Sequence, residues 1–160
     1  DAFYCSQHQC ADSILSRKIL GLTVEYQGQL VDCYSCHINL PNCEGEDQLD
    51  NIRTIVERNQ SQNLKILMGD FNTDAISDPV AYQKIKCLGL LDTFDIAEQK
   101  DSGITVEKAI DGWNGHSEEK RLDYIFLNQP KQVLSSQVIF NGKNKPVVSD
   151  HFGLDVELIL

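Results

Sequence analysis

Short apolar segments that end in acidic clusters are the feature that most constrains the fold of this chain. Leu64–Met68 is an apolar run of strand length, and the Gly69–Asn72 segment follows it directly. Leu122–Leu127 is a second such run, with Asp123 inside it. A buried carboxylate is costly unless it has a partner, so Asp123 requires one close by. These segments therefore predict buried strands that carry polar chemistry at their ends.

The remaining pattern mixes strands with helices. Ile19–Tyr26 and Leu30–Leu40 flank a Gln27-Gly28 turn signal, which predicts a hairpin. Further strands are predicted over Val133–Phe140 and His151–Leu160, helices over Asp47–Asn59 and Pro79–Leu88, a short helix or extended piece over Leu91–Glu98, a long polar connection over Lys100–Ser117, and a loose terminus over residues 1–12. This order indicates one α+β domain over residues 1–160, with sheet packed on sheet and helices outside.

The charge and the apolar pattern limit the partners. Asp and Glu number 24 against 14 Lys and Arg, a formal net charge of −10, which disfavours a large duplex-DNA footprint. A small phosphorylated substrate bound with a divalent cation remains open, because the cation supplies positive charge. No apolar run approaches the ~20 residues of a membrane helix. No exposed apolar hairpin for lipid is evident either, so we expect neither a membrane nor nucleic acid as partner.

The spacing of the six cysteines suggests two sites to consider, one for covalent haem and one for zinc. Cys33 and Cys36 with the following His37 fit the C-x-x-C-H pattern of covalent haem attachment. They lie in a predicted strand, however, and residues three apart on a strand point to opposite faces. A zinc site from Cys5, His8 and Cys10 has equally weak support. We therefore expect reduced, mostly buried thiols and a cytoplasmic protein.

Four places carry groups suited to hydrolysis. Asp70 and Asn72 lie two residues apart and point the same way in extended backbone, so they can hold a water and a phosphoryl oxygen together. Asp123 lies inside a strand, Asp150 and His151 lie at a strand edge, and His37 ends the hairpin strand. Each alone is more often a turn former or a structural residue. Together they fit a phosphoester-hydrolysing constellation.

In this order, the Tyr34–His37, Gly69–Asn72, Arg121–Ile125 and Ser149–Gly153 segments resemble the motifs of the endonuclease/exonuclease/phosphatase superfamily. The resemblance implies a four-layer α/β sandwich of two sheets with the site at its top. The Lys100–Val106, Ile110–Trp113 and Val138–Gly153 segments are more closely similar to the maltose 6′-phosphate phosphatase branch of Gram-positive bacteria.

The resemblance also implies a role for each matched residue. Asp70 would orient and activate the attacking water, and Asn72 would hold a phosphate oxygen. Asp150 would help to bind Mg²⁺, with Mn²⁺ as the alternative metal. His151, oriented by Asp123, would contact the phosphate, while His37 would stabilise the charge that develops in the transition state. Trp113 would stack on a sugar ring or pack on its own loop.

Two family features have no counterpart upstream of His37. The family begins with a strand that bears an Asn and a strand that bears a metal-binding Glu. Their absence predicts that this chain is the C-terminal part of a family domain. The expected function is a Mg²⁺-dependent phosphomonoesterase that acts on a sugar phosphate such as maltose 6′-phosphate. The alternatives are a phosphodiesterase, nuclease or sphingomyelinase-like, and a non-catalytic fragment.

Overall fold

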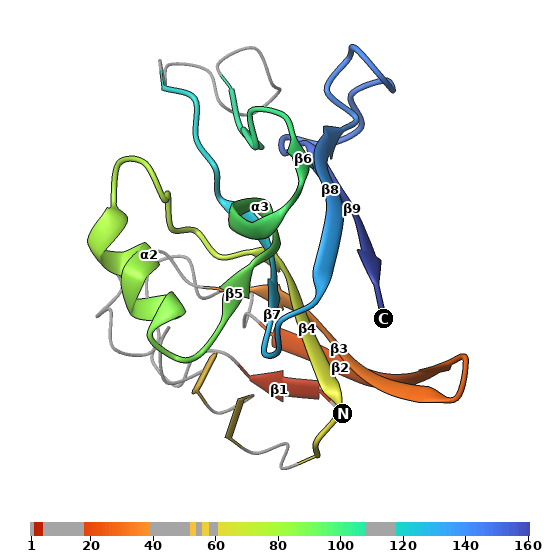
Figure 1. Cartoon of the computed structure of the whole chain (residues 1–160). Coiled ribbons are helices and arrows are strands. Elements are labelled where there is room, and N and C mark those ends of the chain that lie inside the picture. Colours follow the sequence, from red (N-terminus) through yellow and green to blue (C-terminus); the bar gives the residue numbers. More distant parts are fainter. Residues whose placement is uncertain (1, 5–17, 39–51, 54–55, 58–60, 108–117) are drawn as a thin grey trace.

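The described part of the chain forms two packed sheets, with α2 outside the larger sheet and α3 beside β7 and β8 (Figure 1). The computed structural model describes residues 2–4, 18–38, 52–53, 56–57, 61–107 and 118–160. The larger sheet has the strand order β1-β2-β3-β4-β7-β5, and the smaller sheet has the order β6-β8-β9. The elements are β1 (Ala2–Tyr4), β2 (Lys18–Tyr26), β3 (Gln29–His37), β4 (Leu64–Asp70), α2 (Pro79–Lys86), β5 (Leu91–Asp92), α3 (Thr93–Ile96), β6 (Gln99–Lys100), β7 (Asp123–Leu127), β8 (Gln132–Ile139) and β9 (Gly153–Ile159). The predicted α+β fold is confirmed.

The individual elements follow the sequence pattern closely. The predicted hairpin is β2 paired antiparallel with β3, and the Gly28 turn has the positive φ of +78° that glycine permits. Helix α2 begins where the pattern placed it, because Asp78 accepts a hydrogen bond from the Ala81 N–H and caps the first turn. The predicted short piece after α2 divides into β5 and α3.

The structure corrects one prediction near the N-terminus, and two other predictions lie mostly or wholly outside the described residues. The loose terminus over residues 1–12 is wrong for Ala2–Tyr4, which pair antiparallel with β2 as β1. Backbone hydrogen bonds to an exposed edge strand need no apolar periodicity, which explains why the sequence pattern gave no signal. Most of the helix predicted over Asp47–Asn59, and Trp113, lie outside the described residues.

The two faces of β3 point into different cores. Tyr34, Cys36 and Ile38 are buried in one apolar cluster, whereas Val31 and Cys33 belong to another. This confirms the predicted alternation of side chains along the strand. Cys33 and Cys36 therefore lie on opposite faces of the sheet. Cys33, Cys36 and Cys87 are free thiols in the structure. No helix in the described part of the chain is long and apolar enough to cross a membrane.

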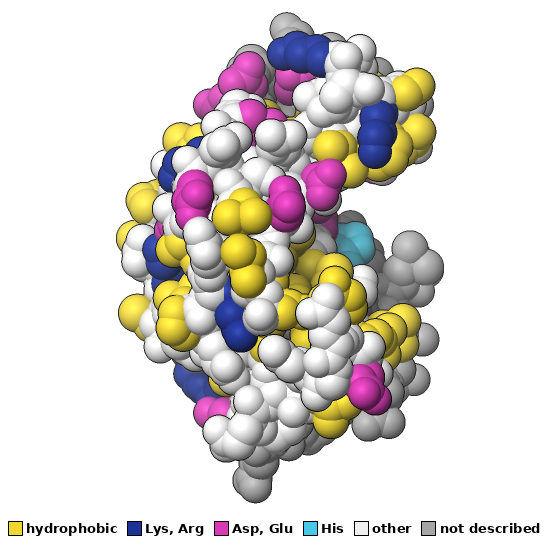
Figure 2. Space-filling view, turned by 45° about the vertical axis from the view of Figure 1, so that its right-hand side comes forward, with side chains coloured by type: hydrophobic (Ala, Val, Ile, Leu, Met, Phe, Trp, Pro, Cys, Tyr) yellow, Lys and Arg dark blue, Asp and Glu magenta, His cyan; other side chains and the backbone are white. Residues whose placement is uncertain are grey.

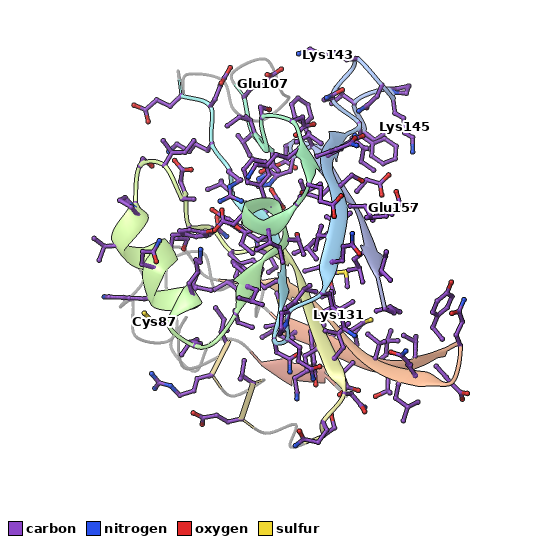
Figure 3. The ribbon with its side chains drawn as sticks, viewed as in Figure 1. Cys87, Glu107, Lys131, Lys143, Lys145 and Glu157 are labelled. Carbon is purple, nitrogen blue, oxygen red and sulfur yellow. The ribbon has the colours of Figure 1, made fainter. Side chains whose placement is uncertain are left out.

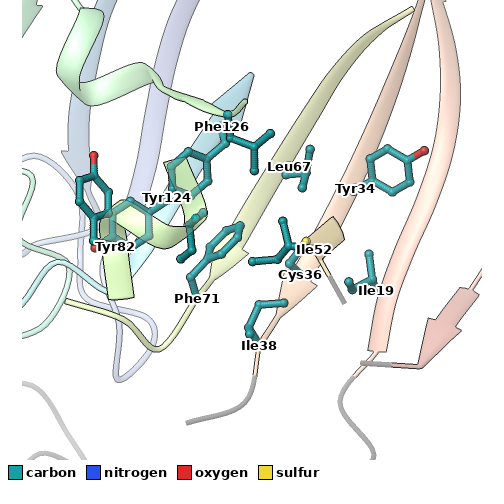
Figure 4. Packing of buried hydrophobic residues seen from close by; sticks show 12 residues of the cluster. Ile19, Tyr34, Cys36, Ile38, Ile52, Leu67, Phe71, Tyr82, Tyr124 and Phe126 are labelled. Carbon is teal, nitrogen blue, oxygen red and sulfur yellow. The ribbon is translucent and has the colours of Figure 1, made fainter. Parts of the chain in front are cut away.

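Aromatic rings fill the core between the larger sheet and α2 (Figure 4). Phe71 meets Phe126 edge to face at 5.0 Å between ring centroids and Tyr124 at 5.8 Å. Tyr82 of α2 stacks on Tyr124 at 5.7 Å. Each buried side chain of this size contributes about 1.5–3 kcal/mol. A second cluster, formed by Val31, Leu64, Leu127 and Val133 with neighbours from β9, joins the two sheets.

A buried ion pair anchors the segment that leads into β7. The Arg121 guanidinium donates to Asp92 Oδ2 at 2.7 Å, and the Tyr82 hydroxyl donates to the same oxygen at 2.7 Å. Asp92 is 1% exposed. Burial lowers the pKa of Arg121, but the charge of Asp92 together with the contributions of Tyr124 and Tyr82 raises it overall. The ion pair holds Arg121 against the rings of Phe94 and Tyr124.

We predict that Arg121→Leu lowers the free energy of unfolding by about 3–5 kcal/mol, because it leaves the Asp92 carboxylate buried without its cation. Urea denaturation followed by circular dichroism measures this loss. Lys86→Leu is the matched control: it removes the cation from the more exposed pair with Asp95 and should cost at most about 1 kcal/mol. Equal effects of the two changes would contradict the prediction.

One face of β2 is apolar and exposed. Leu20, Leu22, Val24 and Tyr26 alternate along the strand, and each is at least 40% exposed. The expectation that the chain lacks an exposed apolar hairpin is therefore wrong. Val31 of β3 lies on the same face of the sheet and belongs to the cluster between the two sheets. The exposed strip therefore continues this inter-sheet core beyond the area that β8 and β9 cover. Alternation in the sequence shows that these residues share one face of a strand. It does not show whether that part of the face is covered by another element or exposed to solvent.

We predict that this strip makes the chain self-associate. Leu22→Lys together with Val24→Lys should shift the chain toward monomer, because charge on an exposed strand opposes edge and face pairing. Size-exclusion chromatography with light scattering measures the mass of the particle. Thr23→Lys on the opposite side of the same strand is the control for added charge. A wild-type chain that runs as a clean monomer would contradict the prediction.

Candidate active site

Strand register brings three of the predicted site residues into one row. In the parallel pair of β3 with β4, His37 lies opposite Asp70. In the antiparallel pair of β4 with β7, Asp70 lies opposite Asp123. Side chains at paired positions of neighbouring strands share a face and lie close together. The row His37–Asp70–Asp123 is thus set by backbone pairing across three strands.

Gly69 permits this close pairing just before Asp70. Its φ is +130°, and a Cβ built at this position would lie 2.0 Å from the carbonyl oxygen of Cys36. No side chain fits that space, so the sequence requires glycine here. The backbone then continues in register, since the Ile38 N–H donates to the Asp70 carbonyl at 2.8 Å. Asp70 therefore ends the strand at a fixed position beside His37.

Asp70 and Asn72 form one hydrogen-bonded turn. Asp70 Oδ1 accepts from the Asn72 backbone N–H at 2.7 Å, and Asp70 Oδ2 lies 3.3 Å from His37 Nε2. Asn72 adopts a left-handed backbone (φ +47°), a conformation that asparagine tolerates better than most residues. Its amide nitrogen donates to the Ile38 carbonyl at 2.8 Å. An amide nitrogen carries two hydrogens, so one remains available for a ligand.

His151 and Asp123 form a dyad. His151 Nδ1 lies 2.8 Å from Asp123 Oδ2, and because an ionised carboxylate only accepts, the imidazole donates. This hydrogen bond raises the pKa of His151, burial lowers it, and the charges of Asp123, Asp70 and Asp150 raise it further. The side chains are only 19% and 17% exposed. Asp123 thus has the close partner that the sequence required, whereas its role in orienting His151 stays a prediction.

Asp70, Asp123 and His151 also present ligand atoms that lie within 4.8 Å of one another. The two carboxylates of this group suit a hard divalent cation that keeps part of its water shell, since Mg²⁺ is commonly held by only one or two protein carboxylates. Asp150 is exposed, accepts from the Ser149 hydroxyl at 3.0 Å and is not part of this cluster. Its role in metal binding stays a prediction.

The site faces a hollow beneath a projecting lobe. Figure 2 shows a histidine side chain at the back of this hollow, and the only histidines in the described residues are His37 and His151. Lysine and hydrophobic side chains lie on the lobe above it. Figure 3 places Lys143 and Lys145 on the loop between β8 and β9, which leads to His151. In a chain with a formal net charge of −10, this loop offers local positive charge to an anionic ligand.

The sequence argument missed two residues that hold the site in place. Asp92 is the buried partner of Arg121, and the Thr105 hydroxyl oxygen accepts from the Asp123 N–H at 3.3 Å. Asp92 precedes Thr93 and Phe94 in a pattern typical of a helix cap, which gives no sign of its ion pair. Thr105 lies in a polar connection with no periodic signal.

Comparison with solved structures tests the family resemblance that the four motifs indicate. An endonuclease/exonuclease/phosphatase family protein from Leptotrichia buccalis C-1013-b matches all of this chain at 54% identity, with a TM-score of 0.89. Over its whole length this chain is similar to a member of the endonuclease/exonuclease/phosphatase family. The resemblance predicted from the four motifs is confirmed at the level of the family.

Two solved structures of lower identity share the fold. The mannosyl-6-phosphatase of Bacteroides thetaiotaomicron VPI-5482 matches all of the chain at 19% identity and a TM-score of 0.70. D. rerio TDP2, solved with a single-strand DNA product, matches all of it at 18% identity and a TM-score of 0.73. The chain spans 61%, 65% and 66% of the Leptotrichia, Bacteroides and D. rerio proteins. No family model and no curated protein matches the sequence.

We predict that Asp123→Asn lowers the pKa of His151 toward or below the ordinary value of about 6.5, because the amide keeps the burial but removes the charge. NMR titration of the imidazole in EDTA measures the change. A raised pKa in the folded state means that His151 stabilises the wild type below about pH 6.5 and loses that contribution as the pH rises through the folded value. Asp155→Asn, an exposed acid on β9, is the control. An unchanged His151 pKa in Asp123→Asn would contradict the dyad.

Proposed function

We propose that this chain carries the water-activating and phosphate-binding groups of a divalent-metal-dependent phosphoester hydrolase, a phosphomonoesterase for a sugar phosphate. The single observation that carries the proposal is the convergence of His37, Asp70, Asp123 and His151 from four different strands or strand ends. A general base, two imidazoles and an amide donor around one space are the groups that phosphoryl transfer to water requires.

Asp70 is the group placed to activate water. One of its oxygens is occupied by the Asn72 N–H, and the other lies beside His37, which fixes the plane of the carboxylate. A water that donates to this carboxylate is oriented for attack on phosphorus. As the new O–P bond forms, the water proton moves toward Asp70 and the ester O–P bond breaks on the opposite side.

The neighbouring donors would hold the phosphate. His151 keeps Nδ1 on Asp123, so Nε2 is the ring nitrogen that would donate to a phosphate oxygen. The raised pKa favours the doubly protonated ring, which donates to an anion. Asn72 offers its second amide hydrogen, and His37 lies on the other side of Asp70. These groups would stabilise the charge that the phosphoryl oxygens gain in the transition state.

A divalent cation completes this set. Asp70 and Asp123 would hold it, together with Asp150 if the exposed loop turns inward. Bound there, the metal supplies positive charge to the phosphoryl oxygens. The family's metal-binding Glu has no counterpart in the sequence before His37, so we expect Mg²⁺ to bind this chain weakly. Mn²⁺ is the alternative metal.

The sugar phosphate is the favoured substrate class. The Lys100–Val106 and Val138–Gly153 segments resemble the maltose 6′-phosphate phosphatase branch, and a relative that shares the fold is named a mannosyl-6-phosphatase. A phosphodiester is the second candidate, because the exposed apolar strip of β2 would suit a substrate at a lipid surface. A non-catalytic role is the third reading.

We predict phosphate release from maltose 6′-phosphate in Mg²⁺ and none in EDTA. The panel adds glucose 6-phosphate, mannose 6-phosphate and bis(p-nitrophenyl) phosphate. Asp70→Asn should reduce kcat by about 10²–10⁴-fold, because an amide cannot accept the water proton. Asp155→Asn, the same change at an exposed position on β9, should leave kcat unaltered.

Other results of this substrate panel would contradict specific parts of the proposal. Cleavage of the diester alone would replace the monoesterase by a phosphodiesterase. Equal activity of Asp70→Asn and wild type would contradict the role of Asp70. Release from no substrate would contradict activity of this chain on its own. The same panel on the full Leptotrichia relative, of which this chain spans 61%, would then test whether the remaining part is required.

A further inference from the structure

Thr105 is a fully buried residue whose hydrogen bonds reach the backbone of Asp123 and of Phe152, the residue directly after His151. Its hydroxyl oxygen accepts from the Leu122 N–H at 3.2 Å and from the Asp123 N–H at 3.3 Å. Its carbonyl oxygen accepts from the Phe152 N–H at 2.8 Å, directly after His151. One residue thus holds the backbone on each side of the dyad.

The dyad needs such a link because its two members come from different sheets. Asp123 begins β7 in the larger sheet, whereas His151 precedes β9 in the smaller sheet. No ladder of backbone hydrogen bonds joins these two strands. The distance between the imidazole and the carboxylate therefore depends on whatever fixes one sheet end against the other.

Thr105 is itself fixed. Its N–H donates to the Lys120 carbonyl at 3.0 Å, and the next residue, Val106, forms an antiparallel bridge with Lys120. This bridge ties the 105–106 segment to the chain that enters β7. The side-chain oxygen then fixes the backbone position of Asp123, while the carbonyl oxygen fixes the backbone position directly after His151.

We propose that Thr105 is a positioning residue that aligns His151 with Asp123 across the two sheets. The inference rests on the proposed function, since it assigns a task within that site. It requires the hydroxyl oxygen of residue 105 and not its methyl group. A merely structural threonine would stabilise the fold without a specific effect on the dyad.

Thr93 is the matched control. It is also buried, and its hydroxyl donates to the Ile125 carbonyl on β7 at 2.8 Å. Replacing either threonine by valine keeps the shape and removes one buried hydroxyl. The two variants should lose similar thermal stability, yet only the change at 105 removes a bond to the backbone of Asp123.

The test observes the hydrogen bond of the dyad directly. The Nδ1-bound proton of His151, protected by Asp123, is recorded as a downfield NMR resonance at one fixed pH in EDTA. We expect the resonance in wild type, Thr105→Ser and Thr93→Val, and its loss by exchange with water in Thr105→Val. If Thr105→Val does not fold, Thr105→Ser and Thr105→Ala make the comparison, because both lack the methyl and differ only in the oxygen.

Every outcome decides the proposal. Retention of the resonance in Thr105→Val or in Thr105→Ala would overturn the role of Thr105 and leave the dyad intact. Its loss in Thr93→Val as well would show a general effect of destabilisation and also overturn it. Absence of the resonance in wild type would remove the dyad itself, and with it the proposed function.

Discussion

The hydrogen-bonded pairing of β4 with β3 on one side and β7 on the other is the constraint on which the site depends. This pairing puts His37, Asp70 and Asp123 in one row. A slip of one residue in either ladder would turn Asp70 to the opposite face of the sheet. Gly69 permits the observed register, because only a residue without a side chain can approach the Cys36 carbonyl so closely. The chemistry of the site is thus a consequence of strand register.

The second constraint is the contact between the sheets. The cluster around Val31, Leu64, Leu127 and Val133 joins them at one end, and the dyad joins them at the other. The smaller sheet covers only part of the larger one, which leaves the apolar strip of β2 bare. The chain also spans less than two thirds of the solved relatives. Part of each of these solved relatives therefore has no counterpart in this chain.

Local signals in the sequence were sufficient to predict most of the described elements and to single out candidate site residues, but not the row in which strand pairing places them. Alternation fixed the two faces of β3, and acidic residues at the ends of apolar runs marked Asp70 and Asp123. The pairing of Ala2–Tyr4 with β2 could not be predicted, because an edge strand held by backbone bonds carries no periodic pattern. The Arg121–Asp92 ion pair and the bonds of Thr105 were also out of reach, since each joins residues that are distant in the chain and ordinary in their local context.

Crystals of this chain grown with Mg²⁺ and inorganic phosphate give the most direct test that one site serves phosphoester hydrolysis. The account predicts phosphate density in contact with Asn72 and His151, with a cation on the carboxylates of Asp70 and Asp123. Phosphate bound elsewhere on the protein, or a cation held away from these two carboxylates, would contradict it.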